Sequence, residues 1–407
     1  MKKLTKEERA TRRRYRRHVR WWKFLHLFGP IIKGMYKLHY DKVPKINGSY
    51  LVLANHTTNL DPAIVGLNFK KHMYFVASEH VYRQGWKSKI LWWIFEPIAK
   101  MKGSSDTLTV MKTIRTLREG KNVCIFAEGN RTWNGKSDPS LLTSALGKLV
   151  KASAANLVTY KIEGGFFADP RWGYSRRKGW VHEGVVNVYK KEQLKDMSAE
   201  EIVDVIRKDI YQNDYETQSI NPVRYKGKNL AEGLETALCV CPECKSIGKL
   251  TTLKNSIKCT KCGLSTDYTE YGYFSDGFKF HTIEEWDDWQ EAFYKDYISQ
   301  IPDTTSPLFA DEDVELNALS QDHSSQSLGK GTFTMFKDRF EFTTNEKTTV
   351  IPFNEIPDMS IFAKTGLTFK NDKSGIHYEF KTDRRLNVRK YLSCWNYLRT
   401  PAPEGSV

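Results

Sequence analysis

Between Tyr50 and Thr217 short apolar runs alternate with segments of helical periodicity, and this alternation restricts the possible folds more than any other feature of the chain. Five runs are typical of strands: YLVLA, HMYFVA, NVCIFA, NLVTYKI and WVHEGVVNVY. Two intervening segments, SDTLTVMKTIRTLREGK and LLTSALGKLVKAS, repeat apolar residues at helical spacing. Such alternation predicts an α/β layer with a mostly parallel sheet flanked by helices, whose sites lie beyond the carboxyl ends of the strands.

With 407 residues, the chain exceeds the length that one hydrophobic core usually serves, so several domains are expected. Changes in composition predict five parts. They are a basic arm with an amphipathic segment (1–40), the α/β domain (41–225), a cysteine module (235–275), a helix with a polar linker (276–328) and a β-rich domain (329–400). The acidic, polar run DTTSPLFADEDVELNALSQDHSSQSLGKG is expected to be a flexible connection.

The net charge of +15 is concentrated at the start of the chain, where Met1–Lys23 contains eleven Lys and Arg residues against two Glu. The segment WWKFLHLFGPIIKGMYKL follows, and a polybasic stretch before aromatic amphipathic residues is typical of an anchor on an anionic membrane surface. A solvated arm followed by a core helix is the alternative. No apolar run reaches the roughly 18 residues of a membrane-spanning helix, and no secretory signal is visible. We therefore expect a peripheral protein on the cytoplasmic side of the membrane.

The stretch LVLANHTTNLDPAIVG places His56 at the end of a predicted strand and Asp61 directly before a proline. Asp61 followed by Pro62 is a good helix start, and capping alone explains this aspartate. The intervening Thr57, Thr58 and Asn59 favour a turn that brings the carboxylate to the imidazole. A carboxylate on one ring nitrogen leaves the other able to accept a proton near neutral pH. From this stretch alone, a catalytic pair and a structural histidine both remain open.

A second polar cluster closes the strand in NVCIFAEGNRTWNG. Gly129 lets the backbone approach a ligand, and Arg131 offers the planar fork that suits a phosphate or a carboxylate. Glu128 precedes them directly.

These two stretches, in this order, resemble the glycerolipid acyltransferases typified by 1-acylglycerol-3-phosphate acyltransferase. NHTTNLD is similar to their His-x4-Asp motif and FAEGNR to their FPEGTR motif, within a region from Val43 to Thr217. The resemblance implies transfer of an acyl group from an acyl-CoA or acyl-carrier-protein thioester to a hydroxyl of a glycerol phosphate or related lipid, in phospholipid biosynthesis. It makes His56 the general base and Asp61 its orienting partner, with Glu128, Gly129 and Arg131 holding the acceptor.

The chain also departs from the family's pattern. Ala127 and Asn130 replace the usual proline and threonine of the third motif, and Thr159 stands in the strand where the fourth motif normally has proline. The arginine of the second motif is missing, and the nearest basic residue assigned to its place is Lys102. Because lysine cannot make a bidentate contact, the hydroxyl acceptor could be another lipid or a glycolipid headgroup.

Two C-x-x-C pairs, Cys241 with Cys244 and Cys259 with Cys262, predict a four-thiolate zinc site that resembles a zinc ribbon. All four ligand positions are supplied by protein, which predicts a structural metal that provides folding energy to a short module. Cys239 is a less usual substitute for Cys241.

From Gly331 to Thr400, six short β-type runs and a closing helix resemble the pleckstrin-homology or GRAM-like group, so a small β-sandwich-like domain is expected there. Two rival functions remain: a non-catalytic lipid-binding or scaffold protein on an acyltransferase fold, and a nucleic-acid-binding protein. The second is unfavoured because TTLKNSIK, between the cysteine pairs, is only mildly basic and the arm leads into tryptophans rather than into a recognition helix.

Overall fold

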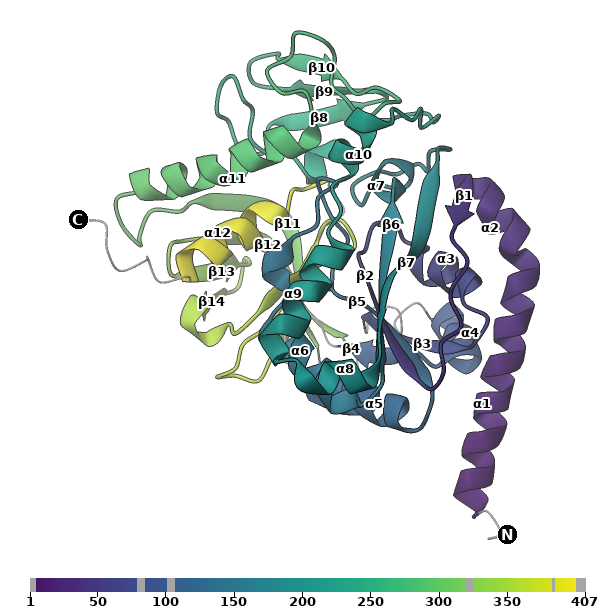
Figure 1. The fold of residues 1–407 in the computed structure, drawn as a ribbon. Coiled ribbons are helices and arrows are strands. Elements are labelled where there is room, and N and C mark those ends of the chain that lie inside the picture. Colours follow the sequence, from purple (N-terminus) through teal and green to yellow (C-terminus); the bar gives the residue numbers. More distant parts are fainter. Residues whose placement is uncertain (1–4, 79–84, 101–106, 320–324, 383–384, 400–407) are drawn as a thin grey trace.

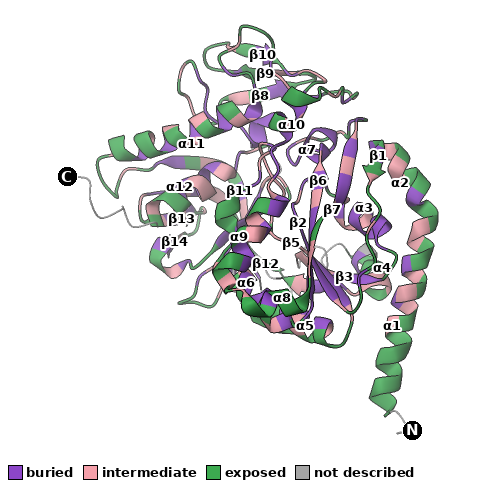
Figure 2. Ribbon diagram, in the orientation of Figure 1, coloured by how far each residue is buried: buried purple, intermediate pink, exposed green. Residues whose placement is uncertain are grey.

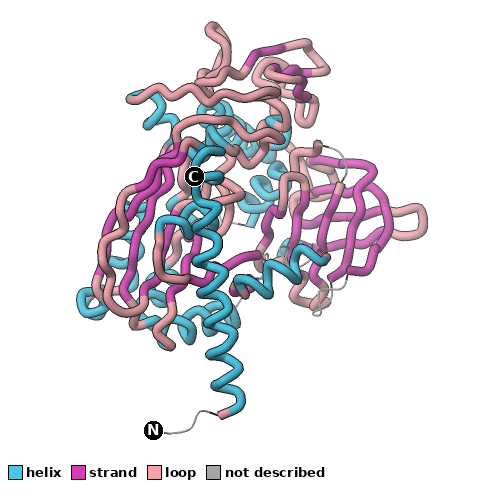
Figure 3. The backbone as a smooth tube through the Cα atoms, turned by 90° about the vertical axis from the view of Figure 1, so that its right-hand side faces the viewer, coloured by secondary structure: helices cyan, strands magenta, loops and turns pink. Residues whose placement is uncertain are grey.

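The fold is that of a computed structural model, which describes residues 5–78, 85–100, 107–319, 325–382 and 385–399. Two seven-stranded sheets and one three-stranded sheet organise these residues. Figure 1 shows the elements in chain order, and Figure 3 shows the two large sheets as separate bodies, one on each side of the long N-terminal helix in that view.

The first large sheet has the strand order β1-β7-β6-β2-β5-β3-β4. Its strands are β1 (Leu38–Tyr40), β2 (Tyr50–Ala54), β3 (Met73–Ser78), β4 (Ile98–Lys100), β5 (Asn122–Phe126), β6 (Asn156–Glu163) and β7 (Val181–Tyr189). All neighbours pair in parallel except β6 and β7, which are antiparallel. The predicted α/β architecture with a mostly parallel sheet is therefore confirmed. Strands β1 and β4 have three residues each, too few for a recognisable pattern, and were not expected.

Helices flank this sheet. They are α3 (Asp61–Asn68), α4 (Trp86–Phe95), α5 (Thr107–Arg118), η3 (Pro139–Leu141), α6 (Ser144–Ser153), α7 (Gly165–Ala168), α8 (Lys191–Asp196), α9 (Ala199–Ile210) and α10 (Asp214–Ile220). Helix α9 illustrates why they form: Ser198 and Glu201 make a capping box, and buried Ile202 and Ile206 lie on one face. The central strand β2 is buried along its whole length (Figure 2), so the residues that follow it are held on a rigid base.

The basic arm is helical and does not stay apart from the body. Helix α1 (Lys6–Leu25) is followed by η1 (His26–Phe28) and α2 (Gly29–Tyr36). Trp22 is buried, and its indole Nε1 donates a hydrogen bond to the carbonyl of Phe69 at 3.0 Å. The first turns of α1 are exposed and extend beyond the body (Figure 2). Among the residues that the structure describes, no helix combines the length and the apolar character needed to cross a bilayer.

The cysteine module forms the three-stranded antiparallel sheet of β8 (Leu250–Leu253), β9 (Ser256–Cys259) and β10 (Ser265–Asp267), after η4 (Leu234–Thr236) and before α11 (Ile283–Gln300). Its aromatic residues Tyr268 and Phe274, together with Trp286 of α11, belong to the same buried cluster as Val52 of the first sheet. The module therefore shares a core with the α/β part of the chain.

The second large sheet is antiparallel, in the order β14-β13-β12-β11-β17-β16-β15, and α12 (Arg389–Arg399) packs on it. Its strands are β11 (Phe309–Leu319), β12 (Ser325–Met335), β13 (Arg339–Thr343), β14 (Thr348–Pro352), β15 (Met359–Phe362), β16 (Gly366–Lys370) and β17 (His377–Lys381), with η5 (Phe353–Glu355) between β14 and β15. The six predicted β-type runs are all present.

The expectation of a polar linker up to residue 328 is wrong, because β11 lies in the middle of this sheet and β12 beside it. Val314 and Leu316 are buried, while Glu312 and Asp313 are exposed. The acidic residues thus occupy the solvent side of a strand whose other side faces the core, and their number obscured the alternation in the sequence.

Candidate active site

His56 and Asp61 meet in the turn that joins β2 to α3. The imidazole Nδ1 lies 2.7 Å from Asp61 Oδ2, and the His56 ring stacks on Phe126 of β5 with 4.4 Å between ring centres. Asp61 is fully buried, whereas the His56 side chain keeps about a fifth of its surface exposed. In the tautomer whose Nδ1 proton is directed at the carboxylate, Nε2 is the basic nitrogen of His56.

The Asp61 carboxylate is held by the turn itself. It accepts hydrogen bonds from the backbone N–H of Thr57 at 2.7 Å and of Thr58 at 3.0 Å, and from the Thr58 hydroxyl at 2.6 Å. Helix α3 begins at Asp61, its N-cap position is Leu60, and no side chain caps it. Asp61 is therefore not the N-cap residue that the sequence suggested. Its side chain points back to the turn, which fixes it beside the imidazole.

The Glu128 segment follows β5, which pairs with β2, so both polar stretches leave the same edge of the sheet. The backbone N–H of Thr132 donates to the carbonyl of His56 at 3.1 Å and ties the two stretches together. Gly129 has φ of +70°, a conformation that favours glycine. Glu128 and His56 line one pocket with Asn55, Thr57, Thr132, Gly135, Ser137 and Gln212.

Glu128 is buried in that pocket, and its Oε1 has no hydrogen-bond partner among the described residues. Burial raises the pKa of Glu128 to about 8; the negative charges of Asp138 and Asp61 add to the rise, and the Ser137 hydroxyl opposes it. At neutral pH the carboxyl group therefore keeps its proton and can donate as well as accept a hydrogen bond.

Arg131 lies in a wall formed by residues that no sequence motif indicated. Its guanidinium donates to the main-chain carbonyls of Asp169 at 3.3 Å and Arg171 at 3.5 Å. Burial lowers the pKa of Arg131, and the nearby Asp169 opposes this. Within the described part of the chain, no carboxylate forms an ion pair with Arg131. Its charge is thus held in place mainly by neutral groups, which leaves it suited to an anionic ligand.

Lys102, the sequence candidate for a further basic contact, lies outside the described residues. Another lysine stands near this site instead. Lys100 ends β4, and its Nζ would lie 3.6 Å from a Cβ atom placed on Gly129. The sequence offered two lysines in IAKMKG, and nothing in their spacing favoured the first.

Residues of elements far along the chain hold the loop that follows Arg131. Asn134 Nδ2 donates to Asp287 Oδ2 of α11 at 3.0 Å. Arg389 of α12 makes a bidentate pair with the same carboxylate, at 2.7 and 3.0 Å. The Trp133 ring lies close to two guanidinium groups, with Arg171 at 4.3 Å and Arg389 at 5.4 Å from its centre. Helices α11 and α12 therefore help to fix the loop that carries Arg131.

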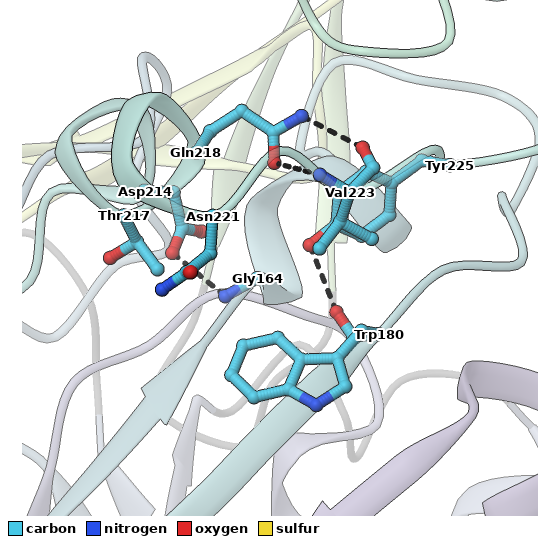
Figure 4. Close-up of a pocket in the computed structure, with 8 residues that line it drawn as sticks. All are labelled: Gly164, Trp180, Asp214, Thr217, Gln218, Asn221, Val223 and Tyr225. Carbon is cyan, nitrogen blue, oxygen red and sulfur yellow. Dashed lines mark hydrogen bonds between the residues drawn. The ribbon is translucent and has the colours of Figure 1, made fainter.

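A second and larger pocket, of about 320 Å³, lies beside the first. Figure 4 shows its lining residues, which are Gly164, Trp180, Asp214, Thr217, Gln218, Asn221, Val223 and Tyr225. Gln212 of the first pocket donates to Asp214 of the second at 3.0 Å, so the two are neighbours. None of the residues predicted for the site lines this larger pocket, and its size alone gives it no role in the chemistry.

The four cysteines of the small module form one cluster. The sulfur atoms of Cys241, Cys244, Cys259 and Cys262 all lie within 4.8 Å of one another, and Cys239 is not among them. The Cys241–Cys262 and Cys244–Cys259 distances are 3.6 and 3.8 Å. A tetrahedral zinc ion with bonds of about 2.3 Å needs sulfurs about 3.8 Å apart, so these residues fit that metal.

Comparisons with known proteins bear on the same region. The family model described as Acyltransferase matches residues 36–163, which include both polar stretches. We call this matched part of the chain the acyltransferase domain, after the family that it resembles. It extends from the end of α2 through β6, while the family match leaves the cysteine module and the second sheet outside.

Among solved structures, the chain is similar to the 1-acyl-sn-glycerophosphate (LPA) acyltransferase PlsC from Thermotoga maritima. The identity is 17%, the match covers 51% of this chain and 81% of that one, and the TM-score is 0.41. It is also similar to Inner Membrane Complex Sub-compartment Protein 3 from Toxoplasma gondii, at 13% identity over 26% of this chain and 81% of that one, with a TM-score of 0.18. We draw no functional conclusion from either likeness. The comparison with curated proteins gave no match.

Proposed function

We propose that the chain is a membrane-peripheral acyltransferase that moves an acyl group from an acyl-CoA or acyl-carrier-protein thioester to a hydroxyl of a lysophosphatidic acid-like lipid, on the cytoplasmic side of a membrane. The observation that carries the proposal is the hydrogen-bonded pair of His56 and Asp61, with His56 and Glu128 lining one pocket. This pair lies inside the matched acyltransferase domain.

In this proposal His56 is the general base. Its Nε2 takes the proton from the acceptor hydroxyl as that oxygen attacks the thioester carbonyl carbon. The tetrahedral intermediate then collapses, the carbon–sulfur bond breaks, and the proton held by His56 passes to the leaving thiolate. Asp61 keeps the Nδ1–H in place and stabilises the imidazolium that forms between the two steps.

No protein nucleophile is required, because a thioester is already activated and the enzyme mainly has to align the reactants. Cys124, the cysteine nearest to the site in sequence, is fully buried in β5, and burial raises the pKa of its thiol far above the usual range. It is therefore unsuited to act as a thiolate.

Arg131 and Glu128 are proposed to hold the acceptor. The Arg131 guanidinium donates to two neutral main-chain carbonyls and so retains its attraction for a phosphate. The protonated Glu128 carboxyl can donate a hydrogen bond to a phosphate or hydroxyl oxygen. Lys100, exposed beside Gly129, adds positive charge at the same place.

A cluster of exposed apolar side chains supports the membrane part of the proposal. Trp21 packs edge-on against Phe24 of α1 and Trp93 of α4, and Phe24 packs against Phe28. Leu27 and Ile31, next to these rings in sequence, are 70% and 63% exposed. We call Trp21, Phe24, Leu27, Phe28, Ile31 and Trp93 the aromatic face. Exposed arginines of α1 flank it, which suits an interface with anionic lipid.

The proposal is tested with the purified full chain, vesicles containing lysophosphatidic acid, and palmitoyl-CoA or palmitoyl-carrier protein labelled in the acyl group. Wild-type protein should form labelled phosphatidic acid. His56→Ala should lower the rate by at least about 100-fold, because general-base catalysis typically contributes this much or more. The circular dichroism spectrum and the metal content should not change.

His39→Ala is the matched control, since His39 is an exposed histidine of β1 that does not line the pocket. It should keep the wild-type rate. A wild-type rate in His56→Ala would disprove the mechanism. Vesicle binding without turnover on either donor would instead support the scaffold alternative.

A further inference from the structure

The hairpin formed by β15 and β16 lies against the wall of the acyltransferase domain that holds Arg131. Arg171 joins the two parts: its Nη1 donates to the carbonyl of Arg131 at 3.0 Å, and its Nη2 donates to the carbonyl of Ile361 in β15 at 3.1 Å. The guanidinium is buried, so the contact is part of the packed structure. One side chain thus separates the hairpin from the backbone of Arg131.

The turn of this hairpin carries Lys364. Its ammonium donates to the carbonyl of Trp172 at 3.3 Å and to the carbonyl of Gly173. Two of its three N–H donors point to these neutral oxygens, and the ammonium also lies over the Tyr174 ring, 3.8 Å from its centre. Burial lowers the pKa of Lys364 to about 8, the positive charge of Arg131 adds to this effect, and Asp169 opposes it. Lys364 therefore lies within electrostatic reach of Arg131 and largely retains its charge at neutral pH.

Positive charge exceeds negative charge at this junction. Arg131, Arg171 and Lys364 are all at least half-buried, and none has a carboxylate within ion-pair distance among the described residues. Asp169 is the nearest acid. Its carboxylate already accepts the Tyr36 hydroxyl at 3.2 Å and lies 3.9 Å from Arg176. These cations have neutral partners, but buried cations without a carboxylate are costly, and an anion bound between them would reduce this cost.

The other end of the hairpin lies near the remaining basic residue of the site. Burial raises the pKa of Asp358, which directly precedes β15, and the positive charge of Lys100 opposes the rise. Lys100 itself is beside Gly129. Asp358 is thus within electrostatic range of Lys100, while Ile361 of the same strand is joined to the backbone of Arg131 through Arg171.

We propose that Lys364 is a specificity residue of the acceptor site, which binds the anionic headgroup of the lipid acceptor together with Arg131. The second large sheet would thus take part directly in choosing the substrate. This inference rests on the function proposed above. It favours acceptors with a phosphate or a similar anion over neutral acceptors such as monoacylglycerol.

The test uses Lys364→Gln in the full chain, because glutamine keeps N–H donors for the carbonyls of Trp172 and Gly173 but removes the charge. The KM for lysophosphatidic acid should rise about tenfold, the effect of losing one charged contact of about 1.4 kcal/mol. The kcat, the KM for palmitoyl-CoA and the turnover of monoacylglycerol should change less than twofold. Lys364→Arg should restore much of the acceptor binding.

Lys347→Gln is the matched control, since Lys347 is an exposed lysine in the turn between β13 and β14 of the same sheet. It should behave as wild type. An unchanged KM for lysophosphatidic acid in Lys364→Gln would overturn the proposal. So would a raised KM for palmitoyl-CoA alone, which would assign Lys364 to the phosphates of the donor.

Equilibrium binding of short-chain lysophosphatidic acid, measured by calorimetry on wild type and Lys364→Gln, separates this inference from the function on which it rests. If no variant transfers acyl groups but Lys364→Gln binds this probe about tenfold more weakly, the enzyme proposal fails and the binding site stands. Equal binding by the two proteins overturns the site whether or not transfer occurs.

Discussion

Buried carboxyl groups of the acyltransferase domain differ in what surrounds them. Asp61 accepts hydrogen bonds from two backbone N–H groups and two hydroxyls, in addition to His56. Glu128 faces a pocket and keeps its proton at neutral pH. Glu183 of β7 is fully buried beneath the site, and burial raises its pKa to about 8, with the charge of Asp61 adding to the rise and Tyr160 opposing it. Glu183 has no part in the proposed chemistry, so its effect is on stability.

Glu183→Gln should reduce the loss of stability with rising pH. The folded protein binds the Glu183 proton more tightly than the unfolded chain, whose glutamates titrate near 4.5. Stability is therefore lost as pH rises from about 4.5 to about 8, by up to about 1.4 kcal/mol per pH unit. The thermal midpoint of the variant should exceed that of wild type at pH 7.5 by more than at pH 5.

The exposed Glu192→Gln variant should show the pH dependence of wild type. Parallel curves for wild type and Glu183→Gln between pH 5 and 8 would mean that Glu183 is not buried as a neutral group.

At this scale, sequence reasoning succeeded where the signal was local. The five-residue spacing between His56 and Asp61, with turn-forming residues between, was enough to suggest their contact, and the contact is present. Asp169 and Arg171 could not be found in this way, because they reach Arg131 through the path of β6 and α7 and belong to no recognisable motif. Lys100 was missed because its relation to Gly129 depends on where β4 ends.

Among the elements, the N-terminal helices combine two roles. Trp22 fixes α1 to the body, and the residue that it meets is Gly66 of α3, where a Cβ atom would lie 2.9 Å from the indole ring. Of the aromatic face, Phe24, Leu27, Phe28 and Ile31 of this segment are exposed, and Trp21 is half-buried. Buried tryptophan and exposed aromatics alternate within a few residues, which is why the sequence left both a core helix and a membrane anchor open.

Leu27→Glu should weaken binding to vesicles that contain phosphatidylglycerol. Burying a leucine side chain contributes about 1.5–3 kcal/mol, so affinity should fall about tenfold or more in a co-sedimentation assay. Leu253→Glu is the matched control, because Leu253 of β8 is equally exposed, at 75% against 70%. If both variants bind like wild type, the aromatic face does not contact the membrane.

The strands of the second sheet show the limit of pattern reading at the element scale. The end of β12 and the runs of β13 to β17 were recognised because aromatic and β-branched residues dominate them. Strand β11 and the first part of β12 were missed because acidic, serine and glycine residues fill many of their exposed positions, although each strand is 11 residues long. What identifies β11 as a strand is its pairing with neighbouring strands, because it pairs with β12 on one side and with β17 on the other.

In the whole molecule, the cysteine module contributes side chains to the core of the first sheet. Its residues Tyr268 and Phe274 are packed into the core that also contains β2. If the four cysteines bind zinc, the metal should stabilise the acyltransferase domain as well as its own strands.

Cys262→Ser should therefore abolish stoichiometric zinc, measured by elemental analysis as one ion per chain in wild type, and should lower the thermal midpoint of the complete protein in a single shared transition. Cys394→Ser should retain the zinc, since Cys394 belongs to the second sheet's core and not to the cluster. Full zinc content in Cys262→Ser would contradict the four-thiolate assignment.

At the scale of the whole molecule, the sequence does not predict which distant parts of the chain are in contact. The bond between Arg171 and Ile361 joins residues 190 positions apart, and neither position carries a pattern that identifies the other. Alternation of strands and helices was sufficient for the architecture of the first sheet, but the placement of the second sheet beside Arg131 required the folded structure.

The hydrogen bonds that connect α11 and α12 to the loop after Arg131 have a consequence for biosynthesis. Asn134 is bonded to Asp287, and Asp287 to Arg389 in the last described helix. A ribosome makes the His56 turn early, yet the loop receives its final supports only when α12 has emerged from the exit tunnel. Maturation of the proposed acceptor site is thus postponed to the end of translation, and a prematurely terminated chain would carry His56 and Asp61 without the complete support of the loop after Arg131.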